Sequence, residues 1–308
     1  MSYRIDPRLP LTSEVRRIAA EEIEAALGHL AGVGDGPDKA LHECRKRLKS
    51  LRALLRLIRP GARKFVKAEN ARYREAAARL AAPRDAAALI ATFDRLAAEF
   101  PEEAAAGSLD PIHDRLVVRR AALLSENFAK AVDAAAAACR TGLARLGKLN
   151  LPDHREAAAD ILADGLLATI RRARKALWRA KERGAPSDFH DLRKAVKAHA
   201  KHVALVKTLW PSPVKPQLKA LDELGERLGE LHDIFVLRAL LDEEGRPLGS
   251  KAETRLLDRL ARRSQRKLCK LCLADASELL CGGPGRALKK TIRKLRRDLV
   301  ERQAAEAA

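Results

Sequence analysis

The sequence has few aromatic residues and no long apolar run. Phe, Trp and Tyr together make up 3% of the 308 residues, which argues against a protein that stacks the bases of single-stranded nucleic acid on aromatic rings. Nowhere do about 18 or more apolar residues follow one another, as a membrane-spanning helix requires. The segment from Met1 to Arg17 also lacks the apolar core of a secretory signal. We therefore expect a soluble, cytoplasmic protein without a membrane partner.

Motifs for disulfide, metal or nucleotide chemistry are incomplete. The five cysteines are an odd number in a chain large enough to fold without disulfides, which is typical of a reducing compartment. Cys269 and Cys272 have no second pair at zinc-site spacing, and His199 and His202 fall on an apolar helix face, so we interpret both pairs as packed side chains. The glycines at 282, 283 and 285 lack the lysine of a phosphate-binding loop. We expect no cofactor, no metal site and no catalytic residue.

What the sequence has in excess is positive charge and helix-forming residues. Lys and Arg number 61 against 41 Asp and Glu, a formal net charge of +20 at pH 7. Self-repulsion on this scale destabilises a compact state, and acidic residues would serve solubility better, so we expect a polyanionic partner. Ala, Leu, Arg, Glu and Lys dominate, and these residues lose little rotamer freedom in a helix. The composition therefore predicts an all-α protein with almost no sheet.

Proline and glycine divide the helical periodicity into segments with short breaks between them. The pattern predicts a helix that begins after Pro10 and ends before Gly32. Further helices are expected over residues 39–59, 64–81 and 85–100, each followed or preceded by proline. Short connections between long helices favour antiparallel neighbours.

The second half of the chain repeats landmarks of the first half in the same order. His42-x-x-Arg45-Lys46-x-x-Lys49 returns as His190-x-x-Arg193-Lys194-x-x-Lys197, Ile58-Arg59-Pro60 as Leu209-Trp210-Pro211, and Arg79-Leu80-x-x-x-x-Asp85 as Arg227-Leu228-x-x-x-x-Asp233. Three matched landmarks in one order indicate an internal duplication. The predicted halves cover residues 11–148 and 153–302, and they meet where the segment from Gly147 to Pro152 interrupts the pattern.

One helix in each half carries a row of basic residues on one face. At about 100° per residue, the cations of 39–59 fall within an arc of about 80°, and the apolar residues lie on the other side. The first row contains His42, Arg45, Lys49, Arg52 and Arg56, with Lys46 in the same motif, and the second contains His190, Arg193, Lys194, Lys197 and Lys201. We interpret these residues as the binding site for an anion.

An anionic ligand explains the two rows better than a solvated helix face does. Exposed helices normally alternate positive and negative charges, because like charges at i, i+4 cost roughly 0.2–0.5 kcal/mol each. Residues 46–66 and 194–218 nevertheless contain no Asp or Glu that would offset the repulsion within the two rows. Four such residues span about 15 Å of helix, which suits an extended ligand with repeated charges. Arg matches phosphate geometry, and Lys can follow a mobile chain. The histidines have two open interpretations, which are phosphate contact and capping of their helix starts.

These motifs resemble the CHAD family, the conserved histidine α-helical domain. Its hallmark is a His-x-x-Arg-x-x-x-Lys-x-x-Arg motif near the start of a long helix in each half. A full match comes from His42, Arg45, Lys49 and Arg52, and a partial one from His190, Arg193 and Lys197. Ala200 replaces the last basic residue of the second copy, where the neighbouring Lys201 is a possible substitute. The similarity extends from about Leu11 to Arg297.

The family also tends to carry a Leu-Gly-x-x-Arg-Asp element after the next helix, and both halves keep part of it. The first copy reads Leu80-Ala81-Ala82-Pro83-Arg84-Asp85, and the second reads Leu228-Gly229-Glu230-Leu231-His232-Asp233. The first lacks the glycine, and the second has His in place of Arg. We interpret Asp85 and Asp233 as caps of the helices that follow them, rather than as catalytic carboxylates, because an Asp side chain satisfies free amides at a helix start.

The resemblance implies one continuous CHAD domain of two four-helix bundles related by a pseudo-two-fold axis. It further implies that basic residues of both halves line a shared surface or pore that binds inorganic polyphosphate, and that the protein is associated with polyphosphate granules. On this basis the surface would be extended by Arg171, Arg172, Arg174 and Lys175. A late basic cluster at residues 289–297 either joins it or forms a separate patch. We find no Glu-x-Glu-x-Lys strand of the CYTH type, which many family members carry in a triphosphate-processing domain.

Two other functions remain open at this point. A cationic surface attracts nucleic acid non-specifically, although the sequence has no recognisable groove-reading motif. A metal-dependent phosphohydrolase would need a carboxylate or Cys/His constellation that the sequence does not show. We therefore expect a binding protein rather than an enzyme, with polyphosphate as the favoured ligand. Its oligomeric state is left unpredicted.

Overall fold

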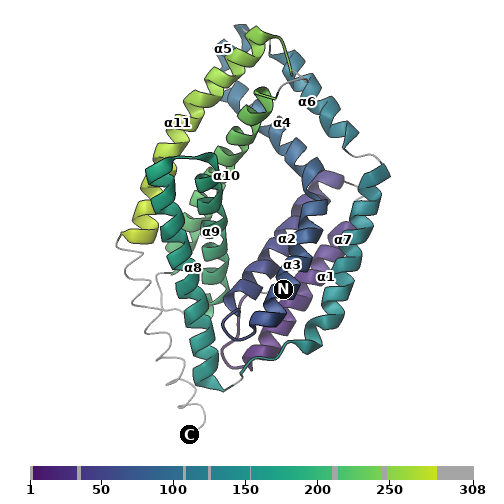
Figure 1. Cartoon of the computed structure of the whole chain (residues 1–308), viewed down its shortest axis with the longest axis vertical. Helices are drawn as coiled ribbons and strands as arrows, with labels where there is room; N and C mark the ends of the chain where they lie inside the picture. Colours follow the sequence, from purple (N-terminus) through teal and green to yellow (C-terminus); the bar gives the residue numbers. More distant parts are fainter. Residues whose placement is uncertain are drawn as a thin grey trace.

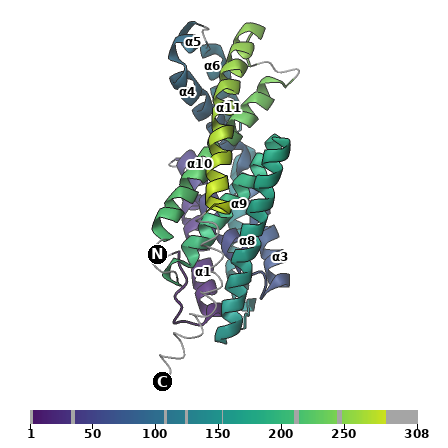
Figure 2. The same ribbon diagram turned by 90° about the vertical axis from the view of Figure 1, so that its left-hand side faces the viewer.

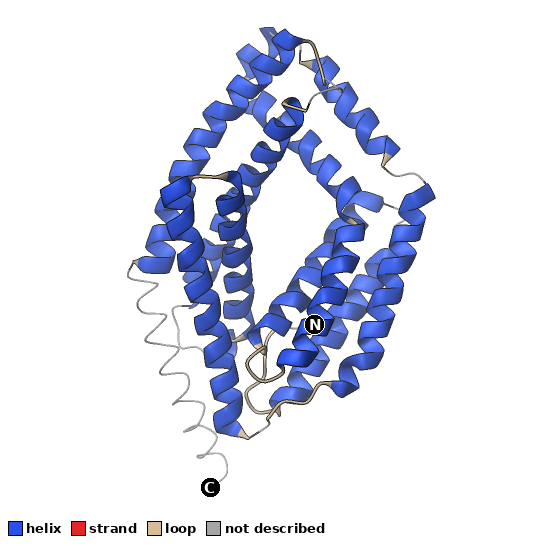
Figure 3. Cartoon of the chain, viewed as in Figure 1, coloured by secondary structure: helices blue, strands red, loops and turns tan. Residues whose placement is uncertain are grey.

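The computed structural model describes residues 3–32, 36–106, 109–123, 126–152, 154–209, 214–243 and 248–282. Within these ranges the chain is helical and contains no strand (Figure 3), which confirms the all-α prediction for this part of the molecule. The α-helices are α1 (Leu11–Ala31), α2 (Pro37–Leu57), α3 (Arg63–Arg79), α4 (Ala81–Glu99), α5 (Pro101–Ala106), α6 (Asp110–Ala122), α7 (Glu126–Arg145), α8 (Arg155–Arg183), α9 (Pro186–Leu205), α10 (Val214–Leu241) and α11 (Lys251–Cys281).

Most of the helices begin and end close to the glycines and prolines of the sequence, and one exception is instructive. Gly184 ends α8 in the left-handed conformation, with φ 63°, which glycine adopts without strain. The exception is α4, which begins at Ala81 rather than at Asp85. Pro83 therefore lies inside the first turn of a helix, where a missing backbone N–H leaves no hydrogen bond unmade.

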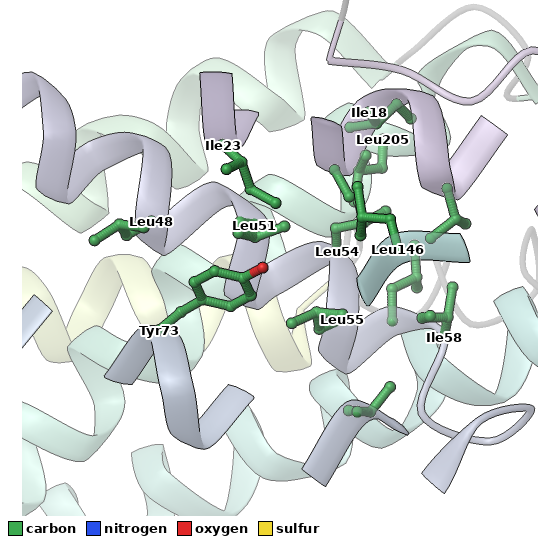
Figure 4. Packing of buried hydrophobic residues seen from close by; sticks show 14 of the residues in the cluster. Ile18, Ile23, Leu48, Leu51, Leu54, Leu55, Ile58, Tyr73, Leu146 and Leu205 are labelled. Carbon is green, nitrogen blue, oxygen red and sulfur yellow. The ribbon is translucent and has the colours of Figure 1, made fainter. Parts of the chain in front are cut away.

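One group of four helices surrounds the largest apolar core. α1 packs on α2 and α7, and α3 packs on the same two helices. The core between them includes Ile23 of α1, Leu51 and Leu55 of α2, and Tyr73 of α3, which lie together in Figure 4. This packing fixes the apolar side of α2 and leaves its other side for the cations.

The second group of four helices is built from α8, α9, α10 and α11. α8 and α10 each pack on both α9 and α11, so α9 and α11 are at opposite corners of the group. Their core includes Leu192 and Val196 of α9, Leu224 of α10 and Cys272 of α11.

A third apolar cluster joins residues from both predicted halves of the chain. Leu89 and Phe93 of α4 and Ile112 of α6 pack with Leu237 of α10 and Leu260 of α11. In Figure 1 these helices close the upper end of the molecule. The apolar cores therefore extend across the predicted boundary near residues 148–153.

The two groups also meet at the lower end in Figure 1, beside an opening between the ribbons. There α8 crosses α2 so closely that any side chain at Gly165 would collide with the Leu57 carbonyl. The Ile5 amide donates to the Leu205 carbonyl at 2.8 Å, which ties the start of the chain to the end of α9. Among the described residues, no helix is both long and apolar enough to span a bilayer.

Candidate functional site

α2 separates its basic and apolar side chains onto two faces, as the sequence predicts. Its apolar face is buried, and it includes Cys44, Leu48, Leu51, Leu54, Leu55 and Ile58. On the other face His42 and Lys49 are exposed, whereas Arg45, Arg52 and Arg56 are half-buried. Because the apolar face of α2 is buried, the cations of its other face lie toward the neighbouring helices.

α9 has the same division of side chains. Leu192, Val196 and Val203 are buried. Lys194 is exposed, and the half-buried basic residues are His190, Arg193, Lys197 and Lys201. The second predicted row is therefore also a real face of a helix.

The cations of α2 act on those of α9, a helix that α2 contacts directly. The dense packing around the Lys49 amine, followed by the charges of Arg45, Arg193 and Lys197, lowers the pKa of Lys49 to about 8. The side chain of Lys49 still reaches solvent, and no ion pair of Lys49 is formed within the described residues. Lys49 and Lys197, one from each half, thus belong to a single group of charges.

We call this group the central cluster. It comprises His42, Arg45 and Lys49 of α2, His190, Arg193 and Lys197 of α9, and Arg84 of α4, whose charges are coupled to one another.

The start of α4 contributes to the α2 side of the central cluster. Arg84 Nε donates to His42 Nδ1 at 3.3 Å. Arg45 Nη1 donates to the Ala77 carbonyl at 2.7 Å, and Arg45 Nη2 lies 3.7 Å from Asp85 Oδ1. Burial, and then the charge of Arg84, lowers the pKa of His42, so this imidazole is neutral at neutral pH.

On the α9 side, His190 stacks on His232 of α10. Their ring centroids are 4.3 Å apart, with 31° between the ring planes. Burial, and then the charge of Lys194, lowers the pKa of His190, and burial followed by His190 lowers the pKa of His232 to about 4. The buried Nδ1 of His190 has no hydrogen-bond partner among the described residues. The pair can therefore offer N–H groups to an anion without carrying charge.

Glycines of α10 allow the cations of α9 to lie against its backbone. A Cβ at Gly225 would be 3.2 Å from Lys197 Cγ, and one at Gly229 would be 3.5 Å from Arg193 Nε. Lys197 Nζ donates to Glu226 Oε1 at 2.9 Å. Burial alone would raise the pKa of Glu226, but this hydrogen bond and the surrounding cations outweigh burial and lower it. Glu226 is therefore ionised, and it partly neutralises Lys197.

Lys46 and Lys201 lie beside the central cluster. Lys46 Nζ is 3.1 Å from Glu43 Oε2 on its own helix. Lys201 Nζ lies 5.5 Å from the centroid of the Tyr3 ring. Burial lowers the pKa of Lys201, whereas the carboxylates of Glu22 and Asp222 oppose this shift. Both lysines therefore have nearby counter-charges, which Lys49 lacks within the described residues.

Arg52 and Arg56 face a different neighbourhood, although they continue the first row. Arg52 Nε donates to Asn70 Oδ1 of α3 at 3.1 Å. Burial, and then the charges of Arg52 and Arg172, lowers the pKa of Arg56 to about 10. These contacts lead to α3 and α8, rather than to the cations of α9.

The remaining predicted residues lie on α8 and are not brought to the central cluster. Arg174 Nε donates to the Leu280 carbonyl at the end of α11, at 2.7 Å. Arg171 and Lys175 are exposed on α8, and neither forms a hydrogen bond or ion pair with α2 or α9 within the described residues. The late basic cluster at 289–297 lies outside the residues that the structure describes.

The structure corrects the interpretation of Asp85 and Asp233 as helix caps. α4 begins at Ala81, four residues before Asp85, and Asp233 lies well inside α10. Asp85 is instead paired with Arg45. Burial raises the pKa of Asp233, and Arg193 opposes this effect. The two carboxylates therefore face the cation rows.

Neither histidine of the motif caps its helix. α2 and α9 begin at Pro37 and Pro186, with Gly36 and Ala185 as their N-caps and no side-chain cap hydrogen bond. His42 and His190 lie more than a turn further on. The capping interpretation is therefore wrong for both histidines.

The discounted histidine and cysteine pairs are packed side chains, as the sequence predicts, whereas the glycines at 283 and 285 lie outside the described residues. His199 and His202 are both fully buried in the interior. His202 Nε2 donates to the Ala53 carbonyl of α2 at 2.8 Å, and its Nδ1 lies 3.0 Å from the Thr169 hydroxyl of α8. Cys272 is a buried free thiol. Within the described residues, no group of three or more His, Cys, Asp or Glu side chains could hold a metal ion.

Three residues of the site were not predicted, namely Arg84, Glu226 and His232. Arg84 and His232 occupy the same position of the Leu-Gly-x-x-Arg-Asp element, and each contacts the motif histidine of its own half. Their matched positions in the two halves are therefore a sequence signal from which both site residues can be predicted. Glu226 gave none, because an isolated acid on a helix is ordinary until its neighbour in space is known.

Comparison with known proteins agrees with this architecture. The chain is similar to PptA from Streptomyces chartreusis, with a TM-score of 0.59 and 16% identity over 88% of this chain and 100% of that chain. It is also similar to the crystal structure of the CHAD domain from the plant Ricinus communis, with a TM-score of 0.54 and 20% identity over 95% of this chain and 93% of that chain. At these identities the likeness shows a common fold. A comparison with curated proteins gives no match.

The sequence match is more specific than the likeness of fold. The family model for the CHAD domain matches residues 17–242, which include both histidine motifs and the helices that carry them. This chain therefore belongs to the CHAD domain family.

Proposed function

We propose that this protein binds inorganic polyphosphate through the central cluster, without chemical turnover. The observation that carries the proposal is the coupling of Lys49 with Arg193 and Lys197, which brings cations of both halves together although Lys49 has no acidic partner within the described residues. Like charges held together in partly buried surroundings are unfavourable, and a bound polyanion would relieve them. The resemblance to CHAD domains makes polyphosphate the favoured anion.

The extent of the cationic surface supports a chain of phosphates rather than one phosphate group. His42, Arg45 and Lys49 span eight residues of α2, or about 10 Å. His190, Arg193 and Lys197 cover an equal length of α9. Neutral imidazoles beside permanent guanidinium charges provide hydrogen bonds and charge together.

An internal duplication is part of this proposal, and matched contacts support it. Arg84 contacts His42 in the first half, and His232, at the equivalent sequence position, contacts His190 in the second. In the same way Asp85 is paired with Arg45, and the charge of Arg193 acts on Asp233. Two copies of one arrangement that face each other would hold a ligand from both sides.

Replacement of Lys49 and Lys197 by Gln tests the proposed site. Affinity for long-chain polyphosphate should fall by at least about 100-fold, because each of the two charge-assisted contacts contributes roughly 1.5–3 kcal/mol. The matched control is Lys64→Gln with Lys67→Gln, two exposed residues of α3 that change the net charge equally. Equal affinity of the two variants, measured by calorimetry at fixed salt, would refute the site.

Competition at several salt concentrations tests the choice of ligand. Polyphosphate should remain bound at salt that releases duplex DNA and heparin, although all three weaken as counterions compete. Loss of this order would indicate non-specific polyanion binding instead. Incubation with polyphosphate and Mg²⁺ or Mn²⁺ should release no orthophosphate, and release would contradict a purely binding role. A cytoplasmic location at polyphosphate granules is part of the same proposal, and microscopy of the tagged protein tests it.

A further inference from the structure

A second row of cations lies on α11, outside the central cluster. We call it the α11 row, and it consists of Lys251, Arg255, Arg259, Arg262, Arg266 and Lys270, all of them exposed. At about 100° per residue these side chains fall within an arc of about 100°. They lie opposite Leu257, Leu260 and Ser264, which are buried. The row extends over about 28 Å at 1.5 Å per residue.

The ion pairs of α11 lie mostly beside this row rather than within it. Arg263 pairs with Glu103 and Lys267 with Glu99, which attach the flank of α11 to α5 and α4. Within the described residues, the one ion pair inside the row joins Arg262 Nε to Asp258 Oδ2 at 2.6 Å. The row therefore contains like charges at i, i+4 that repel one another, as the two rows of the central cluster do.

α11 holds the row straight and directs it outward. The Ser250 amide donates to Glu253 Oε2 at 2.7 Å, and the Glu253 amide donates to Ser250 Oγ at 3.3 Å, which caps the start of the helix. The buried face of α11 packs on α10 and α8. α11 lies at the outer edge of the molecule in Figure 1 and nearest the viewer in Figure 2. Because α9 and α11 are at opposite corners of their group, the α11 row faces away from the central cluster.

We propose that the α11 row is a second polyphosphate-binding surface, so that one molecule holds two chain segments on opposite sides. The identity of the ligand rests on the function proposed above. Four of the six residues are arginines, whose planar guanidinium groups match phosphate oxygens in pairs. The central cluster lies between several helices, whereas the α11 row is open along its length, so a long chain can lie on it without threading through the protein.

The straightness of the row favours a flexible chain over a nucleic-acid duplex. A duplex carries its phosphates on two curved strands, and it would meet a straight row only where a strand crosses it. A flexible polyphosphate can follow all six cations. The row also contains no aromatic side chain on which a base of single-stranded nucleic acid could stack.

Two binding surfaces on one molecule make it a cross-linker of long chains. A chain held at the central cluster of one molecule can be joined through its α11 row to a second chain, and many such links produce a network. A protein with the central cluster alone would coat chains without joining them. The α11 row therefore determines whether polyphosphate is gathered or merely bound.

The test compares light scattering with binding. The row variant is Arg255→Gln with Arg259→Gln, and the control is Arg263→Gln with Lys267→Gln, which removes the same charge from the flank of the same helix. Gln is a good helix former, and circular dichroism verifies that helicity is kept. With long-chain polyphosphate, scattering by the row variant should be at least about tenfold lower than by the control, because cross-linking needs both surfaces. Affinity for a short polyphosphate should stay within about twofold of wild type in both variants, since the central cluster is intact.

The outcomes separate this inference from the proposed function. If the wild-type protein binds no polyphosphate, the proposed function fails and the second surface fails with it. If it binds and cross-links, but the row variant scatters like the control, the α11 row is not a binding surface and the central cluster stands. If the row variant loses binding to duplex DNA while it still cross-links polyphosphate, the row serves nucleic acid and the inference is overturned.

Discussion

At the scale of single residues, the central cluster combines cations that are paired with a carboxylate and cations, among them Lys49, for which no ion pair is formed within the described residues. Arg45 and Lys197 each lie beside a carboxylate, from Asp85 and Glu226. Burial of the Lys49 amine, and then the other cations around it, lowers the pKa of Lys49. Carboxylates thus balance the charge of Arg45 and Lys197, whereas the positive charge of Lys49 is left in excess. On the proposed function, a ligand would lie beside Lys49, between α2 and α9.

The titration of Lys49 predicts how polyphosphate affinity depends on pH. An anion binds the protonated amine, whose pKa in the free protein is about 8. As pH rises through this value the amine loses its proton, so affinity should fall by about tenfold between pH 7 and pH 9. Lys49→Arg keeps its charge over this range, and calorimetry should show a much flatter profile. A wild-type profile as flat as that of the variant would contradict the role of Lys49.

Removal of the charge of Glu226 should strengthen anion binding. In the free protein Glu226 occupies Lys197, so an incoming anion must displace it. Glu226→Gln should raise the affinity for polyphosphate by up to about fivefold, because an exposed ion pair contributes at most about 1 kcal/mol. The affinity for DNA and heparin should rise as well. In the wild-type protein an anion must displace Glu226 from Lys197, and this requirement disfavours anions that bind more weakly than polyphosphate.

The matched control for Glu226 is Glu223→Gln. Glu223 lies on the same helix, but it is paired with Lys219 and Arg227, outside the central cluster. A change of equal size in both variants, measured at one ionic strength, would mean that only net charge matters.

At the scale of the elements, the junction of α2, α8 and α9 depends on two buried histidines. Burial lowers the pKa of His202 to about 3 and that of His199 to about 4. Both rings are neutral in the folded protein, whereas the unfolded chain takes up protons below about pH 6.5. Unfolding is therefore favoured progressively as pH falls from about 6.5 toward 4.

Substitution of each histidine by Leu should have opposite effects. In His202→Leu the Ala53 carbonyl loses its donor, which should cost about 1–3 kcal/mol of stability at pH 7. His199 has no hydrogen-bond partner within the described residues, so His199→Leu should leave stability at pH 7 unchanged or higher and reduce the loss in acid. Thermal unfolding at pH 7 and pH 5 measures both. A sharp loss at pH 7 in His199→Leu would show that the ring has an essential partner.

The sequence predicts the faces of α2 and α9 well and the course of α10 poorly. Periodicity assigns Leu48 and Val196 to the interior because the 3.6-residue repeat of a helix sets which side chains share a face, whatever the helix packs against. The break that separates α3 from α4 is absent from α10, where Gly225 and Gly229 stay helical. Their reason is tertiary, since the side chains of Lys197 and Arg193 lie against them. Contacts of this kind cannot be deduced from one helix alone.

At the scale of the whole molecule, the sequence repeat and the apolar cores divide the chain differently. The repeat predicts halves that meet near residue 150, whereas the third core joins Leu89 and Ile112 to Leu237 and Leu260. Leu162 and Leu166 of α8 also belong to the core of the first group. The repeat shows which motifs of the two halves match. Burial depends on which helix ends pack together, and no motif shows that.

Production of residues 1–152 and 153–308 as separate fragments tests the shared cores. Each fragment should expose apolar surface, bind a hydrophobic dye and unfold without a sharp transition, because its share of the third core has no partner. Mixing the two should restore cooperative unfolding as followed by circular dichroism. A fragment 1–152 that unfolds sharply on its own would show that the third core is dispensable.

The shared upper core also has a consequence for synthesis of the chain. α4 and α6 leave the ribosome early, but their apolar partners Leu257 and Leu260 are translated only after α7, α8, α9 and α10 are complete. For most of translation the nascent polypeptide therefore presents uncovered Leu89, Phe93 and Ile112 to the cell. Chaperones that capture such segments should engage this protein while it is still being made.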